Sequence, residues 1–350
     1  MNEFSQDLSR YQRQYLFHKI GLEGQKKISN ARVTLIGCGA LGTVIASALV
    51  RGGVGFLRLA DRDFIEWNNL QRQVLFDEDD IRQNLPKAVA AKNKLERINH
   101  QVTVEAHVAD ANYSNIESLI EGADLVMDGT DNFEIRYVIN DACVKHNIPW
   151  VYGGCVGDGG LTLSVIPKKT PCLACLFQSA PPPELSPSCD TAGIISPIVN
   201  IIASLQVTEA FKILMGKYDE VARGLYSINA WTRKAPTFGT GDGPDPACPV
   251  CQKGNYEYLK GEKGVRTTTL CGRNAVQISR ESAITIDFPA IADKLKGVGT
   301  VSFNHFMLKC SFKESGSDLE LTLFPDGRAI VKGTSDIPRA KSVYAKYVSV

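Results

Sequence analysis

A glycine-rich loop between a predicted strand and a predicted helix constrains the fold of this chain more than any other feature. Residues 37–42 read Gly-Cys-Gly-Ala-Leu-Gly and fit the pattern G-x-G-x-x-G. They follow a strand pattern at Arg32–Ile36 and open a helix pattern of small and apolar residues at Leu41–Val50. Glycine lets the backbone turn tightly and approach a phosphate, whose charge a helix N-terminus favours. The segment predicts a nucleotide site, and a purely structural glycine turn is the alternative.

The segments after this loop alternate between strand and helix patterns. A strand pattern at Phe56–Leu59 ends at Asp61, where a carboxylate would accept hydrogen bonds from a ribose hydroxyl. Further patterns predict helices at Pro86–Ile98, Ile116–Ile120 and Glu134–Lys145, and strands at Val102–Val108, Leu125–Met127 and Trp150–Tyr152. Such alternation is typical of an α/β fold with a doubly wound, Rossmann-like sheet.

The pattern changes in the second half of the chain. Strand patterns at Leu161–Ile166 and Leu225–Ile228 predict an antiparallel half of the sheet. Between them, a stretch with Pro181, Pro182, Pro183 and Pro187 predicts a surface loop, because proline suits neither a helix interior nor a central strand. A long helix is predicted at Pro197–Met215.

After Lys263 the patterns predict a separate small α+β domain. It would contain an alternating strand at Thr269–Ile278, a helix near Ala290–Leu295, three further strands and a helix at Pro338–Tyr347. The two helices would cover one face of its sheet. Leu319–Phe324, a Pro-Asp-Gly turn and Ala329–Val331 predict a hairpin. Two roles remain open for this domain, a passive appendage or a docking module for a protein partner. We expect an N-terminal arm at residues 1–30, a catalytic domain at 31–258 and this domain at 264–350.

Composition excludes several classes of function. A net charge of +1 and a pI near 7.5 do not favour nucleic acid or an anionic membrane as a partner. We find no apolar run approaching the ~20 residues that span a bilayer, and the polar N-terminus lacks a signal-peptide layout. A cytoplasmic location is therefore expected. There the ten cysteines are better explained as metal ligands, reactive thiols and packing residues than as disulfides.

Two cations near the predicted ribose site favour a triphosphate over a dinucleotide. Arg72 lies in Asn69-Leu70-Gln71-Arg72-Gln73, and Lys87 opens the next helix. Backbone amides largely satisfy a dinucleotide's pyrophosphate, whereas a triphosphate that loses pyrophosphate needs fixed cations for the leaving group. This argues against a nicotinamide dehydrogenase or a flavoprotein. The alternative is that both residues are solvated surface charges.

Four segments together resemble the MoeB/ThiF family, which contains the bacterial relatives of ubiquitin-activating enzymes. They are Arg10–Gln14, the glycine loop, Asn69–Gln73 and the Asp-Gly-Thr-Asp-Asn run at 128–132. The resemblance covers roughly residues 10–255. It implies an enzyme, an adenylyltransferase that uses ATP to adenylate the C-terminal carboxylate of a ubiquitin-like sulfur-carrier protein of the ThiS/MoaD kind. Pyrophosphate would leave, and the adenylate would lead to a thiocarboxylate for thiamin or molybdopterin-type biosynthesis.

The resemblance also assigns roles to individual residues. The ATP site would comprise Gly37, Gly39, Ala40, Leu41, Gly42, Asp61, Asp63, Asn69, Arg72, Gln73, Lys87, Asp131 and Asn132. Asp61 would bind the ribose, while Asn69, Arg72 and Lys87 would hold phosphates. Asp131 would hold Mg²⁺, a hard cation that prefers carboxylate oxygen, unless it only caps the helix that follows. Arg13 would reach the γ-phosphate from the partner subunit of a homodimer.

Two C-x-x-C pairs predict a metal site. Cys172 and Cys175 form one pair, and Cys248 and Cys251 form the other. Each pair can place two thiolates on one turn, so two pairs complete a closed tetrahedral Zn²⁺ site. The gap between them is longer than in a zinc ribbon but agrees with the family pattern, in which zinc clamps two distant segments. Four cysteine ligands leave no open position, so the zinc should stabilise the fold. A thioredoxin-like role is disfavoured because neither pair has a βαβ context.

Cys189 lies at the end of the proline-rich stretch, just before the long helix. A thiol on a loop near a helix N-terminus is accessible, with a lowered pKa. In related proteins this position is the candidate for a thioester or an acyl-disulfide, and an idle thiol is the alternative. The sulfur would come from a separate persulfide donor. We expect the other cysteines to be packing residues: Cys38, Cys143, Cys155, Cys271 and Cys310.

No arrangement of histidine, serine or carboxylate residues indicates hydrolase chemistry. Adenylation needs no strong general base, because the attacking carboxylate is already ionised and catalysis consists of positioning and charge stabilisation. Two alternatives remain. One is adenylation of a short peptide, as in microcin-type modification, and the other is a nucleotide-binding scaffold without catalysis.

Overall fold

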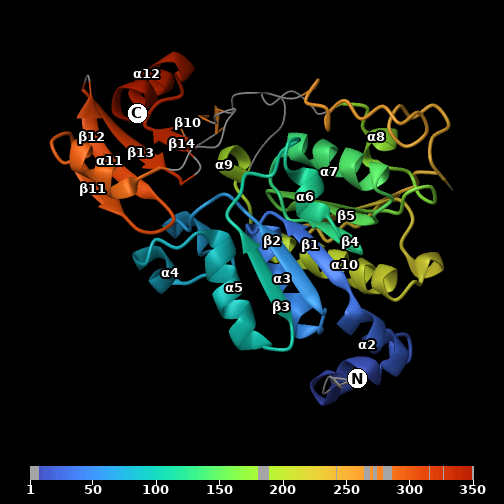
Figure 1. Ribbon diagram of the computed structural model, residues 1–350. Coiled ribbons are helices and arrows are strands. Elements are labelled where there is room, and N and C mark those ends of the chain that lie inside the picture. Colours follow the sequence, from blue (N-terminus) through green and yellow to red (C-terminus); the bar gives the residue numbers. More distant parts are fainter. Residues whose placement is uncertain are drawn as a thin grey trace. The chain divides into compact units, whose positions relative to one another are not determined.

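The computed structural model describes residues 8–179, 189–241, 243–263, 269–270, 274–278, 286–314, 316–325 and 327–348, with the backbone alone at 189–190 and 269–270. The chain divides into two compact units, Met1–Lys263 (unit 1) and Gly264–Val350 (unit 2). Figure 1 shows the helices and strands of each unit.

Unit 1 is built on one eight-stranded sheet with the order β3-β2-β1-β4-β5-β6-β7-β8. The strands from β3 to β5 are mutually parallel, whereas β6, β7 and β8 continue the sheet in antiparallel fashion. Their bounds are Arg32–Ile36 (β1), Phe56–Ala60 (β2), Thr103–His107 (β3), Leu125–Asp128 (β4), Trp150–Val156 (β5), Gly159–Val165 (β6), Leu225–Asn229 (β7) and Thr237–Phe238 (β8). The predicted fold class is confirmed.

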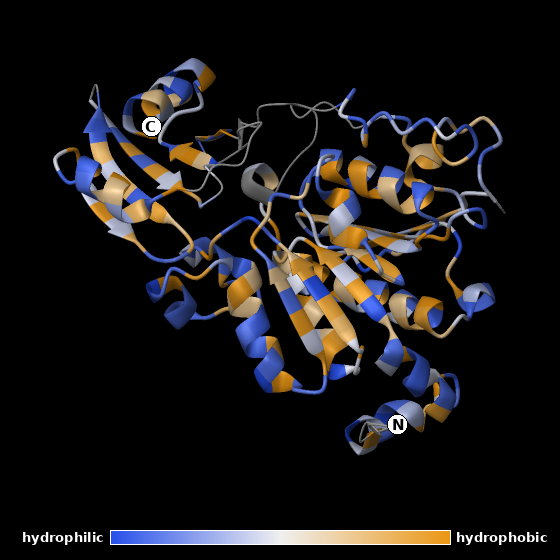
Figure 2. Cartoon of the chain, in the orientation of Figure 1, coloured by the Kyte–Doolittle hydropathy of each residue, from blue (hydrophilic) through white to orange (hydrophobic). Residues whose placement is uncertain are grey.

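Helices cover both faces of this sheet and create two apolar cores. Helices α3 (Ala40–Arg51), α5 (Lys87–Ile98) and α10 (Ser196–Leu214) bury Leu35 and Leu57 on one face. Helices α6 (Ile116–Ile120), α7 (Phe133–Lys145) and α8 (Leu173–Leu176) bury Ile36 and Trp150 on the other. Since consecutive residues of a strand point to opposite faces, Leu35 and Ile36 of β1 belong to different cores. Figure 2 shows hydrophobic residues, coloured orange, along the strands of this sheet and on the helices that cover it.

Helix α10 differs from the expectation that no apolar segment approaches the length needed to span a bilayer. By length and composition it is apolar enough to cross a membrane, with 19 residues and a mean hydropathy of 1.3. It is apolar because it packs against α3 on one side and against β5 and β6 on the other. Half of its apolar window is buried inside unit 1, as in the core helix of a globular domain.

The N-terminal arm packs at the end of the sheet away from the glycine loop. It contains a 3-10 turn (Leu8–Tyr11), α1 (Gln12–Tyr15) and α2 (Gly21–Asn30). The buried Tyr11 hydroxyl accepts a hydrogen bond from Asn99 at the end of α5, and Gln14 donates to the Gly52 carbonyl after α3. Short elements complete unit 1: Trp67–Asn69, α4 (Glu78–Arg82), α9 (Cys189–Ala192) and Tyr218–Glu220. The proline-rich stretch at 181–187 lies outside the described residues.

Unit 2 is a six-stranded antiparallel sheet with the order β11-β12-β13-β14-β10-β9. Its elements are β9 (Thr269–Leu270), β10 (Ala275–Ile278), α11 (Phe288–Leu295), β11 (Thr300–Phe303), β12 (Leu308–Glu314), β13 (Ser317–Leu323), β14 (Ala329–Lys332) and α12 (Ile337–Val348). Residues of α11 and α12 pack with the strands in one apolar core, and the predicted β13–β14 hairpin is confirmed.

Two details of unit 2 differ from the sequence-based expectation. The run Thr269–Ile278 is not one strand, because β9 and β10 pair antiparallel and Asn274, at the start of β10, has a left-handed φ of 44°. Alternation alone could not reveal that turn. Four strands, β11 to β14, lie between the two helices where three were expected, since the short edge strand β11 is largely exposed.

Candidate active site and metal centre

The glycine loop lies at the carboxyl end of β1 and packs against the loop after β4. Gly37 has a left-handed φ of +86°. A Cβ on Gly42 would lie 2.1 Å from the Gly37 carbonyl oxygen, and one on Gly129 would lie 2.4 Å from the same atom. Beside Gly39 the space is open, since a Cβ there would have only the Gln73 amide nitrogen as a neighbour, at 4.0 Å. The loop is thus closed toward the protein and open where a phosphate would approach the start of α3.

Asp61 follows β2 and is bonded to the glycine loop. Its Oδ2 accepts from the Cys38 N–H at 2.6 Å, and its Oδ1 accepts from the Asp63 N–H at 2.7 Å. Burial raises the pKa of Asp61, and the nearby Lys87 charge opposes that effect. Each carboxylate oxygen keeps a second lone-pair direction, so a ribose hydroxyl has an acceptor here.

Lys87 is nearly buried at the first position of α5. Its Nζ lies 3.3 Å from Asp63 Oδ2, and its backbone N–H donates to the Asp63 carbonyl. Next to this pair, Arg62 Nη1 lies 2.9 Å from Asp110 Oδ1, which follows β3. The carboxyl ends of β2 and β3 therefore carry a network of fixed charges. Removing water around such charges strengthens their effect on a phosphate.

The segment Asn69–Gln73 forms a tight turn over the glycine loop. Asn69 is buried, and its Oδ1 accepts from the Glu66 N–H in a capping box. Arg72 is half-buried and donates from Nη1 to the Asn68 carbonyl at 2.7 Å. Gln73 is 3% exposed, and its Oε1 has no hydrogen-bond partner among the described residues. A buried polar atom without a partner is costly, which is typical of a site that a polar ligand completes.

The loop after β4 presents Asp131 to solvent. Asn132 caps α7, because its Oδ1 accepts from the Glu134 N–H at 2.8 Å. Capping is therefore not the role of Asp131. In the described part of the chain, the exposed Asp131 carboxylate makes no hydrogen bond or ion pair that would block it, and its charge acts on the guanidinium groups of Arg62 and Arg136. A free carboxylate of this kind fits a divalent cation.

Arg13 is the predicted residue that the fold places far from the others. It lies on α1 at the C-terminal end of α3, while the glycine loop lies at the N-terminal end of that helix. The 12 residues of α3 rise about 18 Å in all. No arginine side chain spans that distance.

Cys189 begins helix α9, which packs against β5, and its side chain lies outside the described residues. The segment after α9 bonds to the β5–β6 turn, since Gly157 N–H donates to the Gly193 carbonyl and Ile195 N–H donates to the Gly157 carbonyl. The backbone of residue 189 therefore belongs to the antiparallel side of the site. Of the expected packing cysteines, Cys38, Cys143 and Cys310 are buried and Cys155 is half-buried, while Cys271 is not described.

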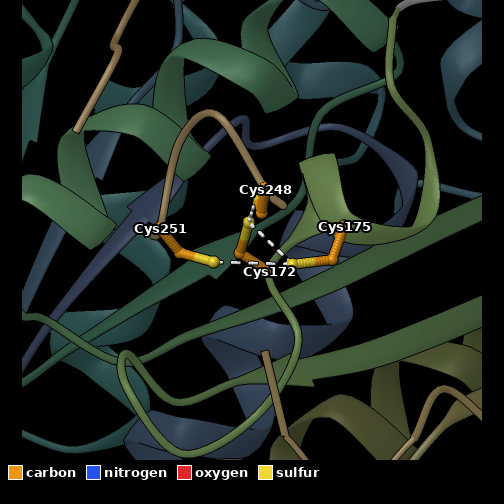
Figure 3. Close-up of side chains that lie close together, drawn as sticks. All are labelled: Cys172, Cys175, Cys248 and Cys251. Carbon is orange, nitrogen blue, oxygen red and sulfur yellow. Dashed lines mark hydrogen bonds between the residues drawn. The ribbon is translucent and has the colours of Figure 1, made fainter. Parts of the chain in front are cut away.

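Four cysteines from two distant segments converge beside α7 (Figure 3). The Sγ atoms of Cys172 and Cys175 lie 3.7 Å apart, as do those of Cys172 and Cys248, and Cys175 lies 3.5 Å from Cys251. A tetrahedral site with Zn–S bonds of 2.3 Å requires sulfur separations of about 3.8 Å. All four atoms lie within 4.8 Å of one another, so the cluster fits a Zn²⁺ ion with no ligand position left open.

The segment after the second cysteine pair is fastened by a buried carboxylate on α7. Asp141 Oδ2 accepts from the N–H groups of Tyr258 and Leu259 at 3.1 and 3.3 Å. The Tyr258 ring stacks on Tyr137 with centroids 4.7 Å apart. Burial raises the pKa of Asp141 to about 6. Together, the cysteines and Asp141 hold residues 248–259 against the body of unit 1.

Sequence patterns missed several polar residues beneath the site. Arg136 and Asp128 form a buried ion pair with Nε and Oδ2 3.0 Å apart, and Gln206 of α10 is fully buried beside them. Arg62 and Asp110 were also missed. For Gln206 a signal existed: it occupies the buried stripe of α10 together with Val199, Ile202, Ala203, Ala210 and Ile213. A polar residue in such a stripe indicates a specific hydrogen-bonding task.

The fold and site define a nucleotide-binding α/β protein with a closed four-cysteine centre. The model of the ThiF family matches residues 11–250, and the chain belongs to this family. It is 44% identical over 340 residues to the sulfur carrier protein ThiS adenylyltransferase of Bacillus subtilis, spanning 97% of this chain and 99% of that protein. It is 35% identical over 254 residues to the sulfur carrier protein adenylyltransferase of Thermus thermophilus, spanning 70% and 91%.

Solved structures share the fold of unit 1. The crystal structure of Escherichia coli MccB with ATP superposes with a TM-score of 0.62 at 27% identity, covering 71% of this chain and 75% of that one. The similarity to the B. subtilis protein spans nearly the whole chain and so includes unit 2, whereas the match to the T. thermophilus protein spans 70%.

Proposed function

We propose that this protein uses ATP to adenylate the C-terminal carboxylate of a small ubiquitin-like sulfur-carrier protein. The observation that carries the proposal is the similarity over 97% of the chain to a ThiS adenylyltransferase. The site agrees with that chemistry, because an open glycine loop, two cations and a free carboxylate meet at one edge of the sheet. The carrier carboxylate would attack the α-phosphorus of ATP, forming an acyl-adenylate and releasing pyrophosphate, for thiamin or molybdopterin-type biosynthesis.

Each residue of the site then has a defined task. Asp61 accepts hydrogen bonds from the ribose. Lys87 and Arg72 stabilise the charge that builds on the leaving pyrophosphate, and Asn69 and Gln73 hold the phosphates from the turn above the loop. Asp131 would hold Mg²⁺, which neutralises phosphate charge when bound. The chain needs no general base, since the attacking group is already a carboxylate and the protein has only to align it.

The position of Arg13, far from the glycine loop of its own chain, supports a homodimer as the active form. It lies about 18 Å along α3 from the glycine loop of its own chain, so it can reach a γ-phosphate only from a second copy. Exposed apolar side chains flank it on the arm, with Leu16 63% and Phe17 51% exposed. Such a surface suits burial in a symmetric interface.

Subunit mixing tests the contribution from a second copy. Arg13→Ala and Arg72→Ala subunits should each be inactive alone. After mixing, half of the dimers would be heterodimers with one intact site of two, so about a quarter of the wild-type activity should return. No recovery in a mixture proven to contain heterodimers would place Arg13 in the site of its own subunit, and full activity of Arg13→Ala alone would place it outside the reaction.

The sulfur step is proposed to involve a separate persulfide donor. Cys189 begins the short helix beside β5, on the side from which the carrier tail would enter. Its thiol would take part after adenylation, as an acyl-disulfide or thioester partner. Zn²⁺ on Cys172, Cys175, Cys248 and Cys251 would only stabilise the fold, because four thiolates close its coordination sphere.

Peptide adenylation is the second candidate, because the core superposes on MccB. ATP–pyrophosphate exchange separates the two functions. Exchange should depend on a carrier protein with an intact C-terminus and should not respond to short peptides, whereas peptide-dependent exchange would favour the second candidate. No exchange with either substrate, in protein that still binds ATP, would favour a nucleotide-binding scaffold without catalysis.

A further inference from the structure

Strands β4 and β5 separate at their carboxyl ends, next to the candidate site. Their parallel ladder pairs Val126 with Trp150 and Met127 with Val151, and the register ends there. In a continued ladder the Gly153 N–H would donate to the Asp128 carbonyl. Instead, the Gly153 N–H points to the Asp128 side chain, with N and Oδ2 3.4 Å apart. The backbone groups that the sheet leaves unpaired are satisfied by side chains.

Gln206 of α10 supplies the missing donor. Its Nε2 donates to the Asp128 carbonyl at 2.9 Å and to the Val151 carbonyl at 3.3 Å, so one amide joins both strand ends. The amide is pressed against β5, since a Cβ on Gly153 would lie 2.4 Å from the Gln206 side chain. Helix α10, which carries Gln206, packs against β4 and β5 (Figure 1).

Arg136 of α7 completes the arrangement from the opposite face. Its Nε donates to Asp128 Oδ2 at 3.0 Å, and its Nη2 donates to the carbonyls of Thr130 and Gly153 at 2.8 and 3.0 Å. Asp128 Oδ1 accepts from both the N–H and the hydroxyl of Thr130. We call Asp128, Arg136 and Gln206 the strand wedge, because their side chains bond to the backbone groups where the two strands separate.

Two parts of the site begin where β4 and β5 separate. The loop after β4 carries Asp131 and packs its Gly129 on the glycine loop. The end of β5 leads to Gly157, which bonds to the segment after α9. The wedge therefore sets the spacing between the nucleotide side and the side from which an acyl group would enter. Attack on phosphorus requires the reacting atoms to approach within about 3–3.5 Å in line, so this spacing governs the rate.

We propose that Gln206 is a positioning residue for adenylation, which acts by holding the ends of β4 and β5 at a fixed separation. The inference rests on the proposed function. A methionine at this position would fill a similar space in the buried stripe of α10, yet it could donate to neither carbonyl. A glutamate is a sharper probe. Its protonated form carries one O–H donor, whereas its ionised form would face two carbonyl oxygens without any donor.

The test compares Gln206→Met and Gln206→Glu with the wild type. For Gln206→Met we expect carrier-dependent pyrophosphate exchange to lose 10-fold to 100-fold in kcat, with the Kd for ATP within about twofold because the glycine loop belongs to β1. For Gln206→Glu, the activity relative to wild type should rise as the pH falls from 8 to 6, whereas the relative activity of Gln206→Met should stay flat. Ile213→Val, a buried change near the far end of the same helix, serves as the destabilised control and should keep full kcat.

Hydrogen exchange gives a readout that does not depend on the carrier. In Gln206→Met, peptides covering 128–132 and 151–157 should exchange faster, while peptides covering 36–42 stay unchanged. Full kcat with unchanged hydrogen exchange in these peptides would overturn the inference. An equal loss of kcat in Ile213→Val, destabilised to the same extent, would also overturn it. If the wild type shows no carrier-dependent pyrophosphate exchange, the proposed function fails. The hydrogen exchange of the peptides then still decides whether Gln206 holds the two strand ends. If Gln206→Met does not fold, the pH profile of Gln206→Glu decides alone.

Discussion

The carboxyl edge of the parallel strands and the four-cysteine cluster use polar residues in opposite ways. At the edge, the space beside Gly39 is open, and in the described part of the chain Gln73 Oε1 and the exposed Asp131 carboxylate have no hydrogen-bond partner. In the cluster, each sulfur has the other three within 4.8 Å, and Cys172 and Cys248 are 1% exposed. We therefore expect the open edge to bind and react, and the closed cluster to hold its segments together. Substitutions should divide accordingly, into losses of rate at the edge and losses of stability at the cluster.

The largest effect is expected at the edge. Arg72→Ala should lower carrier-dependent pyrophosphate exchange at least 100-fold, because a preorganised cation is worth about 3 kcal/mol to a developing charge. Lys87→Ala should do the same. The melting temperature of Arg72→Ala should change little, since among the described residues Arg72 donates only to a carbonyl of its own turn. The matched controls Arg82→Ala and Lys92→Ala, on exposed parts of α4 and α5, should keep full activity. Normal exchange in Arg72→Ala would mean that the two regions do not divide as described.

The second effect belongs to the cluster. Cys172→Ser should remove zinc and lower the free energy of unfolding by about 4 kcal/mol or more, as expected for the loss of a structural metal. The fraction that remains folded should keep its affinity for ATP. Metal analysis and thermal unfolding check this, with Cys143→Ser as a buried control that keeps one zinc per chain. Purified wild-type protein without zinc would contradict the assignment of the cluster.

A smaller effect is expected from Asp141, whose carboxylate accepts hydrogen bonds from the segment after the second cysteine pair. The pKa of Asp141 is raised to about 6 in the fold, against about 3.9 in an unfolded chain. The folded state therefore binds the Asp141 proton more tightly than the unfolded state does. The stability that the protonated carboxyl contributes is present below about pH 4 and is lost as the pH rises through about 6. Asparagine keeps the acceptor without the charge, so Asp141→Asn should be about 2–3 kcal/mol more stable than wild type at pH 8 and equal at pH 4. A difference that did not change between these pH values, or one that also occurred in the exposed control Asp79→Asn, would contradict this account.

The smallest effect concerns Cys189. Cys189→Ala should leave pyrophosphate exchange within about twofold of wild type, because a thiol has no part in attack of a carboxylate on phosphorus. Formation of the thiocarboxylate with a persulfide donor should slow, and any covalent adduct with the carrier should disappear. A collapse of exchange in this variant would place the thiol in the ATP site and would extend the open edge to α9.

The sequence predicted the sheet and most of the site because both follow local rules. The glycine loop, the strand ends and the two C-x-x-C pairs are short patterns whose spacing carries the chemistry. The strand wedge could not be predicted in this way, since Asp128, Arg136 and Gln206 meet only through the packing of β4, α7 and α10. The Arg62–Asp110 pair could not be predicted for the same reason, because its members follow two different strands and meet only in the folded sheet. The turn before β10 was missed because the run was interpreted as one alternating strand, whereas Gly272 and Asn274 interrupt the alternation and are typical turn residues.

The most direct test follows the phosphates of ATP. The purified protein is incubated with Mg²⁺, a ThiS-like carrier and ATP labelled at either the α- or the γ-phosphate. We predict that the α-label alone is transferred to the C-terminal carboxylate of the carrier, that the γ-label is released as pyrophosphate, and that a carrier lacking its last residue gains neither. Transfer of the γ-label, or transfer of the α-label to the shortened carrier, would contradict the account.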